Sequence, residues 1–326
     1  MESIERRALY NLLRMNWLTD PTMAVEPWQV EDYRSLPTAT LFERLAKFSI
    51  QLDKSSFQAY ADESESPEDL ADTLSSDLQL KSDAEDQIYL LVFELWRRLT
   101  PEQPALSILC DELDYQIYSY DQGTLVNTTD LPDALNNFIE ILEENVDQGI
   151  KPTEAFQLIS TYCANDLESF LYDFISEQID EDNFSYVHDL IDDFTPFLSD
   201  NKWFNLLRAR FLGHSNLKAV HNILQDLIEN HLNEDNLEFN IELLAFCVEI
   251  GDYPTFKTIL KQSLNLIHTE EDYQDILHIC EDYLHRLDAE TEEAQIHSTL
   301  KKRATIPLDK KFSSSEEELN QIRALL

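Results

Sequence analysis

Apolar residues recur every three or four positions over most of this chain, the spacing that predicts amphipathic α-helices. The pattern is clearest at 3–18, 38–52, 66–77, 83–99, 104–119 and 131–148. Serine- and acid-rich stretches at 53–66 and 77–84 interrupt it, and we expect loops or frayed helix ends there. The sequence therefore predicts an all-α protein.

From residue 131 the helical pattern repeats, with a period of about 34 residues. Large aromatic residues lie near the start of successive helical stretches, at Phe138, Phe170, Trp203, Phe239 and Tyr273. A second helix is expected after a short break in each of the first four repeats, at 152–163, 184–197, 216–230 and 254–267. One hairpin cannot bury both of its apolar faces alone, so stacked hairpins are expected to share a core. An irregular helical domain that reaches this period by chance stays open as the alternative.

This layout resembles the tetratricopeptide repeat, in which a large residue opens the first helix and a small residue lies early in the second. The hairpins that fit best carry Trp203, Leu206, Ala219 and Ile223, and then Phe138, Ile141, Leu142, Gly149 and Ala155. A third has the turn Gly251-Asp252-Tyr253 but places Phe256 where a small residue is expected, and a fourth has Tyr186 there. The resemblance covers roughly 131–290 and implies an α-solenoid whose first helices line a peptide-binding groove.

The remaining segments do not follow the period. We expect an N-terminal helical domain or cap at 1–125 and the tetratricopeptide-like array at 126–300. Residues 301–326 begin with a run of lysine and arginine, and we expect a flexible basic linker that ends in a short helix at 315–325.

Charge restricts the possible ligands. The chain has 64 acidic and 24 basic residues, which gives a formal net charge of −40. Nucleic acids and anionic membranes are bound by lysine and arginine, so direct binding to either is not expected. Residues 101–200 hold 23 acids and a single base, Lys151, a net −22. This segment is either a solvated surface or a surface that recruits a basic protein partner.

Cysteine and glycine usage narrow the class of protein. The four cysteines, Cys110, Cys163, Cys247 and Cys280, form no Cys-x-x-Cys pair and lie in apolar helical runs. Buried, reduced thiols in a cytoplasmic protein are expected. No stretch resembles a signal peptide or is apolar enough to span a membrane. Four glycines in 326 residues disfavour folds that need glycine-rich phosphate loops.

The motifs for catalysis or metal binding are weak. Asp275, His278, Asp282 and His285 recur along one helical stripe and are weak candidate metal ligands, and the polar face of a helix is the favoured explanation for them. Asp111, Glu112 and Asp114 suggest calcium superficially, but the alternating loop of a calcium site is absent. We therefore expect no bound metal, no cofactor and no catalytic residues.

One basic cluster stands out within the acidic chain. Lys202, Asn205 and Arg208 recur every three residues and share a face of the helix that begins near Trp203. Donors of these types are able to clamp a peptide carboxylate, so they are candidate peptide-binding residues. Salt bridges to the surrounding acids are the alternative.

Taken together, the sequence favours a non-catalytic interaction protein: an adaptor, assembly scaffold or chaperone. It is expected to bind a peptide or helix in the repeat groove and a basic partner on the acidic surface. Two alternatives remain: an acidic mimic that occupies the nucleic-acid site of a basic protein, and a metal-dependent helical hydrolase. The sequence leaves the oligomeric state and the identity of the partner open.

Overall fold

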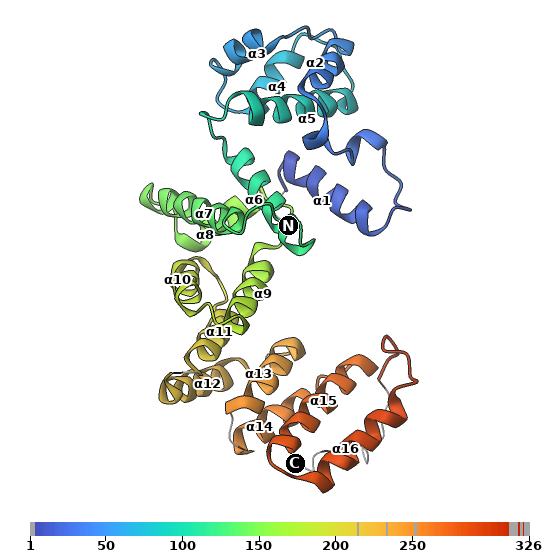
Figure 1. Cartoon of the computed structure of the whole chain (residues 1–326), viewed down its shortest axis with the longest axis vertical. Coiled ribbons are helices and arrows are strands. Elements are labelled where there is room, and N and C mark those ends of the chain that lie inside the picture. Colours follow the sequence, from blue (N-terminus) through green and yellow to red (C-terminus); the bar gives the residue numbers. More distant parts are fainter. Residues whose placement is uncertain are drawn as a thin grey trace. The chain divides into compact units, whose positions relative to one another are not determined.

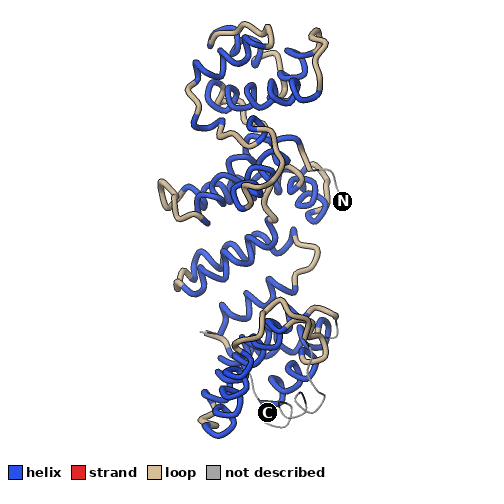
Figure 2. The backbone as a smooth tube through the Cα atoms, turned by 90° about the vertical axis from the view of Figure 1, so that its right-hand side faces the viewer, coloured by secondary structure: helices blue, strands red, loops and turns tan. Residues whose placement is uncertain are grey.

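The structure, a computed structural model, describes residues 4–213, 215–232, 234–250, 253–312, 319 and 322. Within these residues it is all-α, as predicted: 72% helical, with sixteen α-helices and no strand. Figure 2 shows helix along most of the described backbone, with loops between the helices. Each helix in this part of the chain is too short or too polar to span a lipid bilayer.

The Cα positions divide the chain into two compact units. The first comprises Met1–Leu171 with Pro196–Leu198, and the second comprises Tyr172–Thr195 with Ser199–Leu326. The division falls within the predicted repeat array rather than at its start. The domain boundary expected between residues 125 and 126 stays a prediction, because it rests on where the sequence period begins.

The helices of the first unit fall into two groups (Figure 1). The first group is α2 (Thr38–Lys47), α3 (Lys54–Ala61), α4 (Pro67–Ser75) and α5 (Ser82–Leu99), with the 3-10 turns η1 (Pro27–Gln29) and η2 (Tyr33–Ser35) before it in the sequence. The second is α6 (Leu106–Asp121), α7 (Asp130–Asp147), α8 (Pro152–Ser160) and the start of α9 (Leu167–Asp180). Helix α1 (Arg6–Thr19) contacts η1 and α6. Helices α2, α3 and α4 pack on α5, whose nine central residues, 88–96, are all buried. A helix buried on every side is a core helix, so α5 is the centre of this group.

The second unit contains the regular hairpins. Its elements are the rest of α9, α10 (Phe184–Phe194), η3 (Thr195–Phe197, shared with the first unit), α11 (Lys202–Gly213), α12 (Leu217–His231), α13 (Leu237–Ile250), α14 (Tyr253–Ser263), α15 (Glu270–Arg286) and α16 (Glu290–Arg303). Helices α11 and α12, α13 and α14, and α15 and α16 pack as pairs, and α13 contacts both α11 and α15. The first helices of successive pairs therefore stack, as a helical repeat requires.

Two local predictions were wrong. Residues 54–61 form helix α3 rather than a loop, because Asp53 caps its first turn by accepting a hydrogen bond from the Ser56 amide and Phe57 is fully buried. Residues 301–312, the first part of the basic segment, do not form a free linker. Helix α16 continues to Arg303, and the amides of Glu270 and Phe312 donate to the carbonyls of Lys310 and His268. The helix predicted at 315–325 lies outside the described residues except for two positions.

Candidate functional site

Three arginines of the first unit line one open pocket. Its walls come from helices α1, α5 and α6 and the η1–η2 segment. Arg7, Arg14 and Arg34 lie in its wall together with Asp111 and Asp114 of α6. The chain has a net charge of −40, so three arginines at one pocket are unusual. This pocket is therefore the first candidate binding site.

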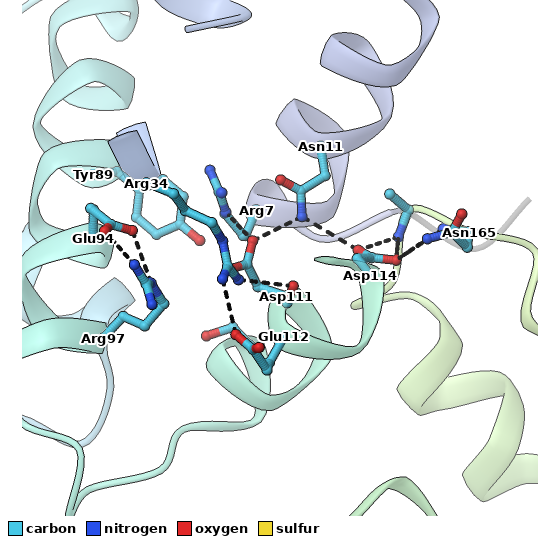
Figure 3. A network of polar contacts seen from close by, with 12 residues as sticks. Arg7, Asn11, Arg34, Tyr89, Glu94, Arg97, Asp111, Glu112, Asp114 and Asn165 are labelled. Atoms are coloured by element: carbon cyan, nitrogen blue, oxygen red, sulfur yellow. Dashed lines mark hydrogen bonds and ion pairs between the residues drawn. The ribbon is translucent and has the colours of Figure 1, made fainter. Parts of the chain in front are cut away.

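Asp111 is the centre of the polar network in Figure 3. Its carboxylate is only 2% exposed and accepts hydrogen bonds from Arg7 Nε and Arg34 Nη2, both at 2.6 Å, and from Asn11 Nδ2 at 2.9 Å. Burial by itself would raise the pKa of Asp111. The two guanidinium groups outweigh that effect and hold its pKa well below the usual range.

Asp114 lies one turn further along α6 and meets a different environment. Its oxygens accept hydrogen bonds from the Ala164 amide at 2.8 Å and from Asn165 Nδ2 at 2.8 Å, so it fastens α6 to the turn before α9. No guanidinium pairs with it among the described residues. Burial raises the pKa of Asp114 to about 6, more than these hydrogen bonds lower it, and the neighbouring Asp111 adds to the rise.

A second buried carboxylate fixes the other side of the pocket. Glu94 of α5 is 1% exposed and pairs with Arg97 and Arg98. Arg98 also donates to the carbonyls of Tyr33 and Leu36, which holds the η2 turn in place. Apart from Asp114, which amides hold, the charged groups of this network are paired with one another. It therefore acts as a joint between α1, α5 and α6 rather than as an open ligand site.

The carboxylates of α7 contrast with this network. Asp133, Glu140, Glu144 and Asp147 are exposed, and their spacing of seven, four and three places them along one stripe. Among the described residues, none of them has an ion pair or a side-chain hydrogen bond. The nearest base in the sequence is Lys151, whose ammonium pairs with Glu154 at 2.6 Å. We call this row of exposed carboxylates the α7 acidic stripe.

An apolar hollow adjoins that stripe. It lies between α6 and α7, is open to solvent, and is lined mainly by Leu109, Leu113, Ala134, Phe138 and Ile141, with Cys110, Glu112 and Asn137 completing the wall. Leu109, Ala134 and Ile141 are half-buried, so apolar surface reaches the mouth of the hollow.

The predicted peptide clamp lies on α11, where its cations already have partners. Lys202 is buried, and its ammonium lies 2.8 Å from carboxylate oxygens of both Asp200 and Glu234. Arg208 pairs with Asp192 at 2.9 Å. Asn205 is half-buried, and its amide reaches only Asn201, at 3.4 Å. A peptide carboxylate would have to displace these acids.

The predicted aromatic positions lie at helix contacts. Trp203 of α11 packs edge-on against Phe239 of α13, with ring centroids 5.0 Å apart, and against Tyr172 of α9 at the same distance. Phe138 meets Phe156 within the α7–α8 hairpin. The remaining two, Phe170 and Tyr273, meet Tyr120 of α6 and Phe312 respectively. Tyr172, two positions after the predicted Phe170, is thus the residue of α9 that continues the row of rings.

The structure does not bring the candidate metal ligands together. No three His, Cys, Asp or Glu side chains form a metal-binding group within the described residues. His278 lies 3.7 Å from Glu281 and His285 lies 3.1 Å from Glu293, so both imidazoles face carboxylates outside the set of four. All four cysteines are buried and form no disulfide.

The sequence did not link Asp111 and Asp114 to Arg7 and Arg34, and it did not place Phe138 and Ile141 at a hollow. Arg7 and Asp111 are separated by 104 positions, and no local pattern links them. The one available signal was the gathering of arginines near the N-terminus. Comparisons with protein families, curated proteins and solved structures found no match to this chain, so the tetratricopeptide likeness stays a resemblance.

Proposed function

We propose that this protein is a non-catalytic interaction protein of the cytoplasm, an adaptor, scaffold or chaperone, that binds a basic partner through the α7 acidic stripe. The observation that carries the proposal is the pairing state of the carboxylates. The buried acids of α6 and α5 have arginine or amide partners inside the fold, whereas the exposed acids of α7 have no ion pair or side-chain hydrogen bond among the described residues.

Unpaired carboxylates on one stripe sum their fields instead of cancelling them. Such a surface steers a cationic partner during encounter and is neutralised when that partner binds. Self-repulsion among the acids opposes the folded state slightly, and a partner that neutralises them stabilises the fold by mass action. Both effects favour a protein partner that is rich in lysine and arginine.

The proposal is tested with two matched variants. The α7-neutral variant carries Asp133→Asn, Glu140→Gln and Glu144→Gln. The control-neutral variant removes three other exposed carboxylates of the same unit: Glu63→Gln, Glu65→Gln and Glu85→Gln. The two variants change net charge equally, so any difference between them reports the position of the charge rather than its amount.

Wild type and both variants are immobilised, and proteins captured from a lysate of the source cells are quantified by mass spectrometry. We expect a basic protein that wild type and the control-neutral variant retain equally. The α7-neutral variant should retain about fivefold less, because each exposed pair contributes about 0.2–1 kcal/mol. Raising salt from about 0.05 M to about 0.5 M should release it. Equal retention by all three proteins would refute the proposal.

A peptide clamp on α11 is a separate part of the prediction. Arg208→Glu reverses the most exposed cation of the set, whose side chain is 35% exposed. If the clamp operates, this variant should lose partners that the α7-neutral variant keeps. If the Arg208→Glu variant retains each captured protein as wild type does, the clamp is excluded while the acidic-stripe proposal stands.

A further inference from the structure

The hollow between α6 and α7 is an apolar recess beside an acidic row, both within the first unit. On α7, Ala134, Phe138 and Ile141 line the hollow, and Asp133, Glu140 and Glu144 form the adjacent stripe. Asn137 connects the hollow and the stripe. It lines the hollow, and it lies four residues after Asp133 and three before Glu140. The apolar and acidic surfaces are therefore contiguous along one helix.

The α6 side of the hollow adds apolar surface and one further acid. Leu109 and Leu113 lie in its wall, and Glu112 stands at its edge with 41% of its side chain exposed. Glu112 is already paired with Arg34 at 3.0 Å. The free negative charge at the mouth thus comes from α7, and an occupant has to present its cations on that side.

We propose that this hollow binds one apolar side chain of a cationic amphipathic helix whose lysines or arginines lie along the α7 acidic stripe. The inference rests on the proposed function and specifies its partner. Charge complementarity selects the occupant: a second copy of this chain, with net charge −40, would be repelled, as would an anionic membrane.

The spacing of the acids favours a helix as the occupant. Asp133, Glu140 and Glu144 recur at seven and four residues, or about 10 Å and 6 Å along the axis. Cations at positions i, i+7 and i+11 of a helix lying alongside α7 have the same spacing. The apolar anchor one turn away then meets the hollow, in the manner of helices that bind in grooves through residues at i, i+3 or i+4 and i+7.

Two synthetic peptides of about four helical turns serve as probes. The first has leucines on one face and lysines on the rest, and the second has alanine in place of each leucine. Binding of each fluorescein-labelled peptide is measured by anisotropy against the full-length protein. We expect wild type to bind the leucine peptide about tenfold or more tightly than the alanine peptide, because the hollow removes a leucine side chain from water.

Asn137→Trp covers the mouth of the hollow from an exposed position, and Ala134→Leu fills it from the wall. Each should abolish the preference for the leucine peptide and leave binding of the alanine peptide unchanged. The use of two variants with different positions guards against misfolding of one, and circular dichroism verifies that each keeps its helices.

The outcomes separate this inference from the function on which it rests. If both hollow variants keep the leucine preference, the anchor site is refuted. If the two peptides bind wild type equally and the α7-neutral variant weakens both, the acidic stripe binds cations and the hollow has no part in it. If neither peptide binds wild type at any salt concentration, the inference and the proposed function both fail.

Discussion

The carboxylates of α6 and those of α7 belong to adjacent helices of one unit, yet they meet opposite surroundings. Asp111 is buried between two arginines, and Asp114 is buried against backbone amides. Asp133 and Glu140 are exposed and have no ion pair in the part of the chain that the structure describes. Both pairs belong to the segment that contributes −22 to the net charge.

The contrast shows that net charge is a poor guide to a binding surface. A buried carboxylate that is already paired contributes to stability and little to the outside field, whereas an exposed unpaired one does the reverse. The two groups should therefore respond differently to mutation, to pH and to salt. The following predictions test that difference, from the largest effect to the smallest.

Asp111→Ala should be the most destabilising change. It removes the buried carboxylate shared by the half-buried guanidinium groups of Arg7 and Arg34 and leaves Arg34 only its pair with Glu112, and breaking a buried pair costs about 3–5 kcal/mol. Glu140→Ala, the matched change on α7, should alter the free energy of unfolding by about 0.5 kcal/mol or less. Urea denaturation measures both. Equal losses from the two substitutions would contradict the distinction between paired and free acids.

The pH dependence of stability should separate Asp111 from Asp114. Folding lowers the pKa of Asp111. Its contribution to the stability of the fold is therefore fully present at pH values above the pKa of Asp111 in the unfolded chain, and it is lost as pH falls below that pKa. The pKa of Asp114 is raised to about 6 by folding, so the native state binds the extra proton first. Its effect therefore has the opposite sign, and stability increases as pH falls through 6.

Asp114→Asn isolates the second effect. Between pH 7 and pH 4.5, wild type should gain about 2 kcal/mol relative to this variant, because one pKa unit corresponds to about 1.4 kcal/mol. Unfolding is followed by denaturant at each pH, with Glu140→Gln as the exposed control. A wild-type stability that falls in parallel with that of Asp114→Asn over this range would show that Asp114 is ionised throughout.

The α7-neutral variant should change stability least. Removing three exposed like charges should raise the melting temperature slightly at low salt, and the gain should disappear in about 1 M NaCl, where charges are screened within about 3 Å. Differential scanning calorimetry at both salt concentrations provides the comparison. A wild-type protein that monovalent salt fails to stabilise would exclude self-repulsion as a factor.

Helices and their hairpin order could be predicted because they follow from local apolar spacing. The first helices α9, α11, α13 and α15 begin at Leu167, Lys202, Leu237 and Glu270, close to the expected period. Helix α3 was missed because serines and acids surround its single buried aromatic, Phe57. Phe256 departs from the small residue of the resembled family, and it is stacked on Tyr283 with ring centroids 3.8 Å apart.

The candidate site depends on tertiary contacts that no local pattern encodes. Asp111 looked like a member of a weak calcium motif until the fold brought Arg7 and Arg34 to it. The hollow is formed by two helices whose contacting faces each look like ordinary core positions. By contrast, all residues of the α7 acidic stripe lie on one helix, so their local spacing and charge are enough to predict it from the sequence.

The most direct test of the central claim is the affinity of an oligolysine peptide for three proteins: wild type, the α7-neutral variant and the control-neutral variant. Anisotropy at about 0.05 M salt, where exposed charges still interact, gives the three dissociation constants. We predict that the α7-neutral variant binds about fivefold or more weakly than wild type, whereas the control-neutral variant binds as wild type does. Equal weakening in the two variants would contradict the claim, because the acidic surface would then act through total charge alone.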